Sequence, residues 1–324
     1  MSRGSFVIIW MIVLFAKNYG TELVMPSHGV TYTLSGGRLG DNLMAYMHAK
    51  WISYHYGIPL IYKPFPLSDL FVFDDIEIKW TQNIQAAFNF QVEFKQYQNI
   101  DMFIKKVFFL DQVLYIIPYF PESNWELTEN AHRDPYFPYF RVSWKDPEFH
   151  AFLKTLIVPK KPIAPMVLPT DKITVAVHIR RGGSYEGEDT ALGFPLKFPP
   201  DEFYLDQLRK LYYIFDEQPF YVYLFTDDED AGTIKKKYQQ TLADLDIKFD
   251  CREEGNRWDA NVLEDFFALT QFDCAIHGES NFSVCAGFLA DYKVEILPKT
   301  FHKIDKKVYI DEVTMKIKGL MKER

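Results

Sequence analysis

Two adjacent arginines at the end of an apolar run are well placed in this sequence to bind an anion. The run 175–179 contains His178 and leads into Arg180 and Arg181, which are followed by two glycines and a polar loop. This pattern predicts a buried strand that carries both guanidinium groups to one edge of a sheet. Two neighbouring cations beside a core are costly unless a doubly charged anion compensates them. We therefore expect a diphosphate at this point.

Polar residues also follow two later apolar runs, 220–226 and 274–277. The residues at these two points include an acidic pair and the start of a predicted helix: Asp227, Asp228, Ser280, Asn281, Phe282 and Ser283. Arginines can hold a diphosphate through paired hydrogen bonds, and a serine-rich helix start adds N–H and hydroxyl donors. A surface salt-bridge pair for the arginines, and helix caps for Asp227, Asp228 and Ser280, are the structural alternatives. Together the three clusters predict a nucleotide-diphosphate site without a compulsory metal.

The composition limits the class of protein. A net charge of -8 and a pI near 5.5 argue against a nucleic-acid partner, which normally requires a basic face. The length of 324 residues suits two domains. The sparse cysteines, Cys251, Cys274 and Cys285, give neither a disulfide framework nor a paired metal motif, so we expect small buried side chains.

Strand and helix patterns alternate along most of the chain and predict an α/β fold. A strand–helix–strand opening covers 30–63, and short apolar strands alternate with helices beyond a proline-rich stretch, which is typical of a doubly wound parallel sheet. The predicted parts of the chain are an N-terminal α/β lobe at 28–158, a Pro-rich linker at 159–171, a C-terminal Rossmann-like lobe at 172–300 and a C-terminal strand and helix extension at 301–324.

The first twenty residues differ from the rest of the chain. An apolar run, 6–16, lies between Arg3 and Lys17. It is shorter than the roughly 20 residues that a membrane-spanning helix needs, but it matches the apolar part of a secretory signal. We interpret residues 1–20 as a signal peptide or a short membrane anchor through which the protein associates with a membrane. A hydrophobic strand or helix buried in the fold is the alternative.

Four segments of the sequence carry motifs. They are SGGRLGDNLMAYMHA at 35–49, HIRRG at 178–182, FYVYLFTDD at 220–228 and EDFFALTQFDCAIHGESNFSVCAGFLA at 264–290. The last three resemble, in order, the motifs of the α1,2-, α1,6- and protein O-fucosyltransferase superfamily. The first resembles the GGRLGNQMFQYA opening of α1,2-fucosyltransferases, the group to which the chain is most similar. Residues 65–165 match no motif of the family.

The resemblance implies a two-lobed enzyme of GT-B-like fold with doubly wound parallel sheets. It implies GDP-fucose as donor in the C-terminal lobe, a glycan acceptor on the N-terminal side, inversion at the anomeric carbon, no cofactor and no metal. It also implies that Arg180 holds the departing β-phosphate, that His178 contacts the nucleotide and that Asp265 contacts guanine. The other residues assigned to the donor are Arg181, Asp227, Asp228, Ser280, Asn281, Phe282, Ser283 and Arg38, the last at a strand-to-helix turn facing the cleft between the lobes.

An acceptor hydroxyl that attacks the anomeric carbon can need a group that takes its proton. In the α1,6 branch this group is a glutamate eight residues after the first motif arginine, and Glu188 has that spacing from Arg180. The resemblance therefore implies Glu188 as the general base. Glu186 and Asp189 are the rival residues, and a solvated acidic loop is the structural alternative.

Departures from the family pattern leave other functions open. The chain has Gly182 and Gly183 where α1,2 enzymes have one glycine and an aspartate, and Asp41 replaces an asparagine. A transferase-fold protein that binds GDP or glycan without chemistry, and a glycosyltransferase that uses another nucleotide sugar, are the alternatives. The acidic stretch 228–230 also has the form of a metal clamp, a short pattern that arises often by chance. The expected location is the Golgi or endoplasmic reticulum lumen in a eukaryote, or the cytoplasmic face of the inner membrane in a bacterium.

Overall fold

The chain divides into two compact units. The computed structural model describes residues 26–94, 104, 108–118, 146–181 and 192–318. Unit 1 consists of Met1–Trp125 and Asp134–Pro162, and unit 2 consists of Glu126–Arg133 and Ile163–Arg324. The predicted N-terminal signal or anchor lies outside the described residues. Among the helices of the described ranges, none has the length and apolar character needed to cross a membrane.

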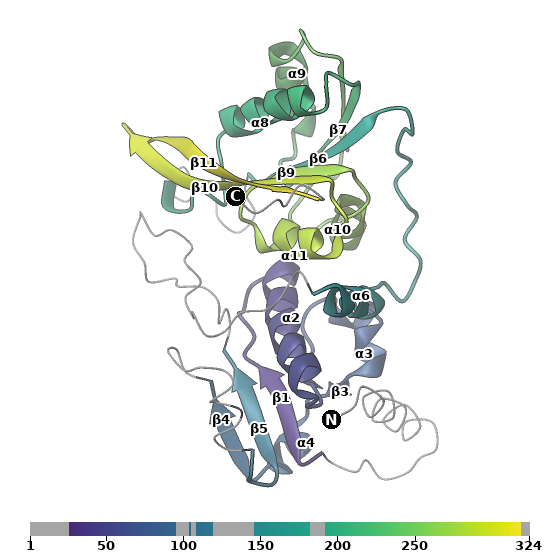
Figure 1. Ribbon diagram of the computed structural model, residues 1–324, viewed down its shortest axis with the longest axis vertical. Helices are drawn as coiled ribbons and strands as arrows, with labels where there is room; N and C mark the ends of the chain where they lie inside the picture. Colours follow the sequence, from purple (N-terminus) through teal and green to yellow (C-terminus); the bar gives the residue numbers. More distant parts are fainter. Residues whose placement is uncertain (1–25, 95–103, 105–107, 119–145, 182–191, 319–324) are drawn as a thin grey trace. The chain divides into compact units, whose positions relative to one another are not determined.

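Unit 1 is built on small parallel sheets (Figure 1). One sheet has the order β1-β5-β4, and a second consists of β2 and β3. The described elements are β1 (His28–Tyr32), α2 (Leu39–Tyr56), β2 (Ile61–Tyr62), η1 (Ser68–Leu70), α3 (Phe73–Ile76), β3 (Ile78–Lys79), α4 (Gln82–Ala86), β4 (Phe90–Glu93), β5 (Val113–Ile117) and α6 (Pro147–Leu156).

Helix α2 forms the centre of unit 1, and its ends follow from the sequence. Arg38 has an extended backbone before the first turn, and Gly57 ends the helix in the left-handed region, where its N–H donates to the Ser53 carbonyl. The helix is buried on most of its surface, so its one buried lysine needs a partner. Lys50 lies 2.7 Å from the Glu77 carboxylate, and both side chains are almost fully buried. Burial lowers the pKa of Lys50, and the charge of Glu77 opposes that shift.

Unit 2 contains a six-stranded sheet with the order β11-β10-β9-β6-β7-β8, in which β11 alone is antiparallel to its neighbour. Helices cover both faces of this sheet, α8 and α9 on one side and α10 and α11 on the other (Figure 1). The described elements are β6 (Ile173–Ile179), α8 (Asp201–Ile214), β7 (Phe220–Thr226), α9 (Ala231–Thr241), β8 (Ile247–Cys251), α10 (Val262–Leu269), β9 (Cys274–His277), α11 (Asn281–Leu289), β10 (Val294–Ile304) and β11 (Lys307–Ile317).

The strand order of unit 2 has a point of reversal between β6 and β9. From β6 the chain proceeds to β7 and β8 on one side, and it then returns to place β9 and β10 on the other. In open α/β sheets, ligands bind outside the carboxyl ends of the strands at such a point. The parallel strands of both units and their flanking helices confirm the predicted α/β fold with parallel sheets. The free, buried state of all three cysteines is also as expected.

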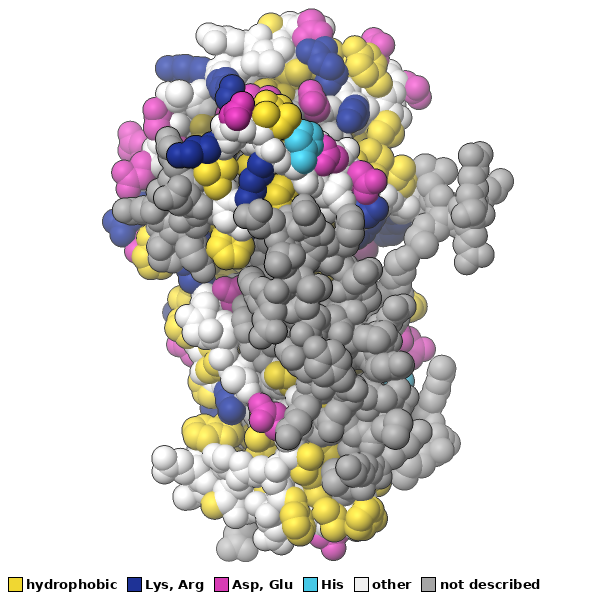
Figure 2. Space-filling model, turned by 90° about the vertical axis from the view of Figure 1, so that its left-hand side faces the viewer, with side chains coloured by type: hydrophobic (Ala, Val, Ile, Leu, Met, Phe, Trp, Pro, Cys, Tyr) yellow, Lys and Arg dark blue, Asp and Glu magenta, His cyan; other side chains and the backbone are white. Residues whose placement is uncertain are grey.

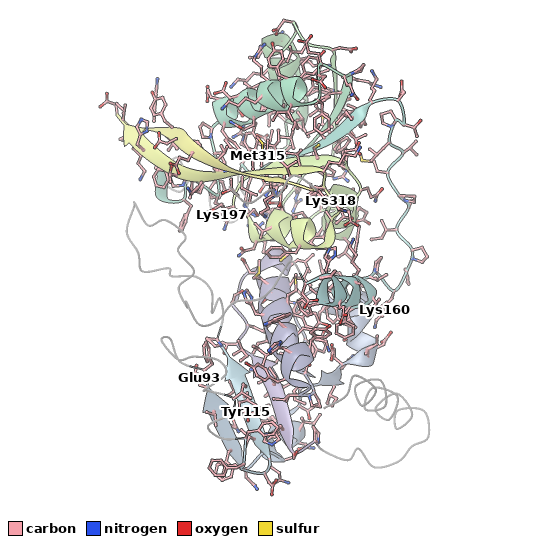
Figure 3. The ribbon with its side chains drawn as sticks, viewed as in Figure 1. Glu93, Tyr115, Lys160, Lys197, Met315 and Lys318 are labelled. Atoms are coloured by element: carbon pink, nitrogen blue, oxygen red, sulfur yellow. The ribbon has the colours of Figure 1, made fainter. Side chains whose placement is uncertain are left out.

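The end of unit 2 differs from the sequence prediction. We expected a strand and helix extension at 301–324, whereas residues up to Ile317 form two long antiparallel strands, and no helix occurs at 301–318 within the described range. The turn between them uses Asp305 and Lys306, both with positive φ. Val313, Met315 (Figure 3) and Ile317 occupy every second position of β11 and pack against the core. This alternation of apolar residues favours a strand over a helix, and the prediction overlooked it.

The outer part of this hairpin carries paired polar and charged side chains. His302 lies 2.5 Å from Asp311, and Lys299 lies 2.8 Å from Glu312. Figure 2 shows lysine, arginine and acidic side chains interspersed on the side of unit 2 toward which the hairpin projects. Charged side chains of this kind protect an exposed sheet edge from pairing with another chain.

Candidate functional site

The candidate site lies at the carboxyl ends of β6 and β9 in unit 2. His178 and His277 are paired in register on these two neighbouring strands, so both histidines lie where the strand order reverses. Arg180 follows the end of β6, and Ser280 precedes the first residue of α11. Apolar residues on both strands bury the backbone up to this edge, which fixes the positions of the polar residues that follow.

Arg180 is the strongest candidate for holding an anion. Its Nη1 lies 3.4 Å from the Ser280 hydroxyl, and its guanidinium carbon lies 5.9 Å from the centre of the Phe198 ring. Its Nε is buried and has no hydrogen-bond partner in the described part of the chain, where Arg180 also makes no ion pair. A buried N–H group of a cation without an acceptor is unfavourable. An anionic ligand at this position would supply both the missing charge and the missing acceptor.

His178 lies two residues before Arg180 and is uncharged at neutral pH. Burial lowers the pKa of His178 to about 3; the charge of Asp227 opposes this shift, whereas His277 and Arg180 reinforce it. The ring stacks against Phe282, with 5.7 Å between the ring centres. Its Nδ1 is buried and has no partner among the described residues. The neutral ring can therefore give a ligand one directed hydrogen bond.

Arg181 is used inside the fold, in contrast to Arg180. Its guanidinium forms a close ion pair with Asp201, the first residue of α8. Asp201 also accepts from Lys237 Nζ at 2.6 Å and from the Tyr238 hydroxyl at 2.9 Å. The charge of Arg181 is thus already compensated, so the two arginines that the sequence paired as phosphate ligands have different environments.

Asp227 and Asp228 organise the turn between β7 and α9. The backbone N–H of Arg181 donates to Asp227 Oδ1 at 2.6 Å, and the N–H of Asp230 donates to Asp228 Oδ1 at 2.9 Å. Asp230 caps α9 by accepting from the Thr233 N–H. The cap of α9 is thus Asp230, and Asp227 and Asp228 instead accept from backbone N–H groups of the neighbouring strand end and of the turn. In the described ranges no group of three or more His, Cys, Asp or Glu side chains is arranged as a metal site.

The β9–α11 loop approaches another backbone segment closely. A Cβ on Gly278 would lie 2.9 Å from the Lys197 carbonyl oxygen, and the Glu279 N–H donates to the Leu196 carbonyl at 2.7 Å. Ser283 Oγ donates to the Ser280 carbonyl at 3.1 Å. The Ser280 hydroxyl is not used to cap α11, and it therefore remains available to Arg180 and to an anion at the helix start.

The remaining residues of the third motif lie beside this loop. Asn281 is the first residue of α11, and the Phe282 ring contacts Phe266 edge-on with 5.5 Å between the ring centres. Asp265, next to Phe266, accepts from Arg252 at 2.6 and 3.0 Å. Burial raises the pKa of Asp265, although Arg252 opposes the shift. Each carboxylate oxygen can accept a second hydrogen bond, so the pair with Arg252 still permits a guanine contact.

Two predicted residues are not part of this geometry. Glu188, with its rivals Glu186 and Asp189, lies outside the described residues. Arg38 belongs to unit 1, where it precedes the first turn of α2 with an extended backbone. The roles assigned to Glu188 and Arg38 therefore stay predictions.

The prediction from sequence missed His277 and Glu295. The His277 ring is buried, and its Nε2 lies 3.1 Å from Glu295 Oε1 on β10. Lys316 on β11 lies 2.6 Å from the other oxygen of the same carboxylate. Burial alone would raise the pKa of Glu295, but the hydrogen bond with His277 and the charges of His277 and Lys316 lower it to about 2. A glutamate inside the apolar run 294–297 was the signal in the sequence, because a buried carboxylate needs a partner.

A hollow of about 370 Å³ occurs elsewhere in unit 2. It is lined by Val167, Leu168, Pro169, Lys172, Tyr221, Lys248 and Asp250. Tyr221 and Lys248 lie near the amino-terminal ends of β7 and β8. The hollow is therefore at the opposite edge of the sheet from the residues described above, and it adds nothing to the anion site.

Comparison with known proteins supports the fold. No family model matches the chain, and no curated protein sequence matches it. The structure is similar to that of a variant of FUT1 from Arabidopsis thaliana in complex with GDP, with 13% identity, 92% of this chain and 75% of that chain covered, and a TM-score of 0.54. The chain thus has the α/β fold of GT-B-type fucosyltransferases.

NodZ from Bradyrhizobium shows a weaker likeness. The match has 14% identity, covers 92% of this chain and 99% of that chain, and has a TM-score of 0.40. The NodZ α1,6-fucosyltransferase soaked with GDP-fucose gives 14% identity, 90% and 99% coverage, and a TM-score of 0.41. Scores of this size support no further inference.

Proposed function

We propose that this protein is a fucosyltransferase that moves fucose from GDP-fucose to a glycan hydroxyl, with inversion and without a metal ion. The observation that carries the proposal is Arg180, whose buried Nε has no partner among the described residues at the reversal point of a nucleotide-binding type of sheet. The fold is one that fucosyltransferases have, and the FUT1 structure contains GDP. The motif order in the sequence supports the same donor.

The proposed chemistry assigns a task to each residue at this edge. When the acceptor hydroxyl attacks the anomeric carbon, the bond to GDP breaks and negative charge collects on the β-phosphate. A guanidinium fixed beside that oxygen stabilises the charge, which is the role of Arg180. Ser280 and the start of α11 add hydrogen-bond donors to the diphosphate. The neutral ring of His178 orients the nucleotide through its unpartnered Nδ1.

The finer assignment to the α1,2 group is supported by the motif at 35–49. We also propose that the N-terminal apolar run 6–16 associates the protein with a membrane, and that the protein acts in the secretory pathway of a eukaryote or at the cytoplasmic face of a bacterial inner membrane. Both proposals depend on the sequence pattern. The glycan acceptor is proposed to bind on the side of unit 1.

A donor screen tests the proposal directly. We expect GDP, in contrast to UDP and CMP, to raise the unfolding temperature, because a ligand at about 100 times its Kd adds about 2.7 kcal/mol to the free energy of unfolding. GDP-fucose should then be turned over with EDTA present. Preference for UDP or CMP would favour another nucleotide sugar, and GDP binding without turnover on any acceptor would favour a binding protein. Absence of both binding and turnover would reject the proposal.

Glu188 provides a second test of the chemistry. We expect Glu188→Gln to lower kcat by about 10²-fold, because the amide cannot take the proton of the attacking hydroxyl. The donor KM should change little, since the carboxylate is assigned to the acceptor. Steady-state kinetics of Glu188→Gln, with Glu186→Gln and Asp189→Asn as matched controls, measure this. A larger loss in either control would transfer the role to that residue.

A further inference from the structure

A continuous chain of hydrogen bonds connects strand β11 with the β9–α11 loop. Lys316 Nζ donates to Glu295 Oε2 at 2.6 Å, and Glu295 Oε1 lies 3.1 Å from His277 Nε2. His277 Nδ1 in turn lies 3.0 Å from the carbonyl oxygen of Gly278. The three side chains come from three adjacent strands, β11, β10 and β9. These hydrogen bonds therefore cross the sheet toward the candidate anion site.

From Gly278 the series of hydrogen bonds continues to Arg180. The Gly278 carbonyl also accepts from the Ser280 N–H at 2.8 Å and from the Ser283 hydroxyl at 3.4 Å. The Ser280 hydroxyl lies 3.4 Å from Arg180 Nη1. His277 is thus one of the contacts that hold the loop facing the anion, together with the bond from the Glu279 N–H to the Leu196 carbonyl.

Both ring nitrogens of His277 face oxygen atoms that can only accept. A backbone carbonyl has no proton to give, and the Glu295 carboxylate, which also accepts from Lys316 Nζ at 2.6 Å, offers a second acceptor. An arrangement in which both nitrogens donate gives His277 two ring protons, and it is the one that satisfies both contacts. Gly287 provides the space for this arrangement, since a Cβ there would lie 2.3 Å from Glu295 Oε1.

We propose that Glu295 is a positioning residue for the diphosphate. It keeps His277 in the cationic form, and through His277 it holds the Gly278 carbonyl so that the Ser280 hydroxyl and Arg180 face the anion. This inference depends on the proposed function, because it takes a nucleoside diphosphate as the ligand. Among the described residues, the charged and titratable groups beside His277, Gly278 and Glu295 include His178 and Arg180 from β6 and its end, Tyr204 from α8, Tyr292, and Lys316 from β11.

Affinity for GDP at two pH values tests the proposal in the full-length protein. For Glu295→Gln we expect calorimetry to give a Kd about tenfold higher than wild type at about pH 7.5, because an amide does not hold the second proton on His277. At about pH 5.5 the ring takes up that proton from solution, and the Kd should return to within about twofold of wild type. A merely structural role of Glu295 would weaken binding equally at both pH values.

Two further variants make this measurement specific. Glu312→Gln is the matched control, because Glu312 pairs with Lys299 on the exposed part of the hairpin and should leave GDP binding unchanged. If Glu295→Gln does not fold, Lys316→Met tests the same series of hydrogen bonds at its β11 end. It should raise the Kd about threefold, since Lys316 is half exposed and its charge is partly screened.

Nitrogen-15 NMR of the histidine rings tests the charge of His277 without any ligand. His277→Gln identifies the signals, which should show two protonated ring nitrogens in wild type at about pH 7.5 and one in Glu295→Gln. A neutral His277 in wild type, or a Glu295→Gln protein that binds GDP like wild type at both pH values, would overturn the inference. A cationic His277 in a protein that does not bind GDP would instead reject the proposed function.

Discussion

Replacing Arg180 by alanine is expected to lower kcat/KM for fucose transfer by about 10³-fold, a loss of about 4 kcal/mol in transition-state stabilisation. The guanidinium is held beside the Ser280 hydroxyl and over the Phe198 ring, so it does not need to reorganise when charge develops on the β-phosphate. Release of GDP from GDP-fucose, followed with saturating acceptor, measures this effect. Arg180→Lys should recover part of the activity, because the charge returns without the paired donors.

The control for this experiment is an arginine of the same unit that is away from the site. Arg209 lies on α8 and pairs with Asp244 at 2.5 Å on the exposed surface, so Arg209→Ala should retain wild-type turnover. Turnover of Arg180→Ala within a few-fold of wild type would remove Arg180 from the proposed mechanism. The same result would not change the assignment of the fold, which is based on the strand order and not on this side chain.

Replacing Asp201 by alanine should lower the free energy of unfolding by about 3 kcal/mol, because it leaves a buried guanidinium without its counter-charge. Asp201 accepts from Arg181, Lys237 and Tyr238, and it is mostly buried at the start of α8. Chemical denaturation at neutral pH measures the loss. The matched control is Asp244→Ala, which removes an exposed ion pair and should cost less than about 1 kcal/mol.

The contribution of Asp201 should also depend on pH. Burial would raise the pKa of Asp201, but Lys237, Arg181 and Tyr238 together lower it below its ordinary value of 3.8. A carboxyl whose pKa is lowered by folding stabilises the folded state above its ordinary pKa, and this contribution is lost as the pH falls through the lowered value. The difference in stability between wild type and Asp201→Asn should therefore be largest near neutral pH and shrink in strong acid. A difference that grew on acidification would contradict this assignment.

The sequence was sufficient to predict most strands of unit 2, because buried parallel strands appear as continuous apolar runs such as 173–179 and 220–226. It could not predict that β9 would lie beside β6, because strand order depends on packing between distant segments. The long β10–β11 hairpin was also missed. Its alternating pattern is only half apolar, since one face of β11 meets the core and the other carries charge.

The site was predicted less completely than the fold. Arg180 and Arg181 are chemically identical in the sequence, and the partner that distinguishes them, Asp201, is twenty residues away at the start of another element. The pairing of Asp265 with Arg252 could not be predicted from local sequence patterns either, because it joins α10 to the segment after β8. Glu295 lies beyond the last motif of the chain, and its relation to the site depends on a strand order that local patterns do not contain.

The neutral ring of His178 has a consequence for the conditions under which the protein can work. With a pKa of about 3, this histidine does not change its charge between weakly acidic and neutral solution. Histidines near phosphates often make affinity vary with acidity, whereas the guanidinium of Arg180 stays protonated throughout. His178 would therefore not make donor affinity vary as the protein moved through compartments of falling pH.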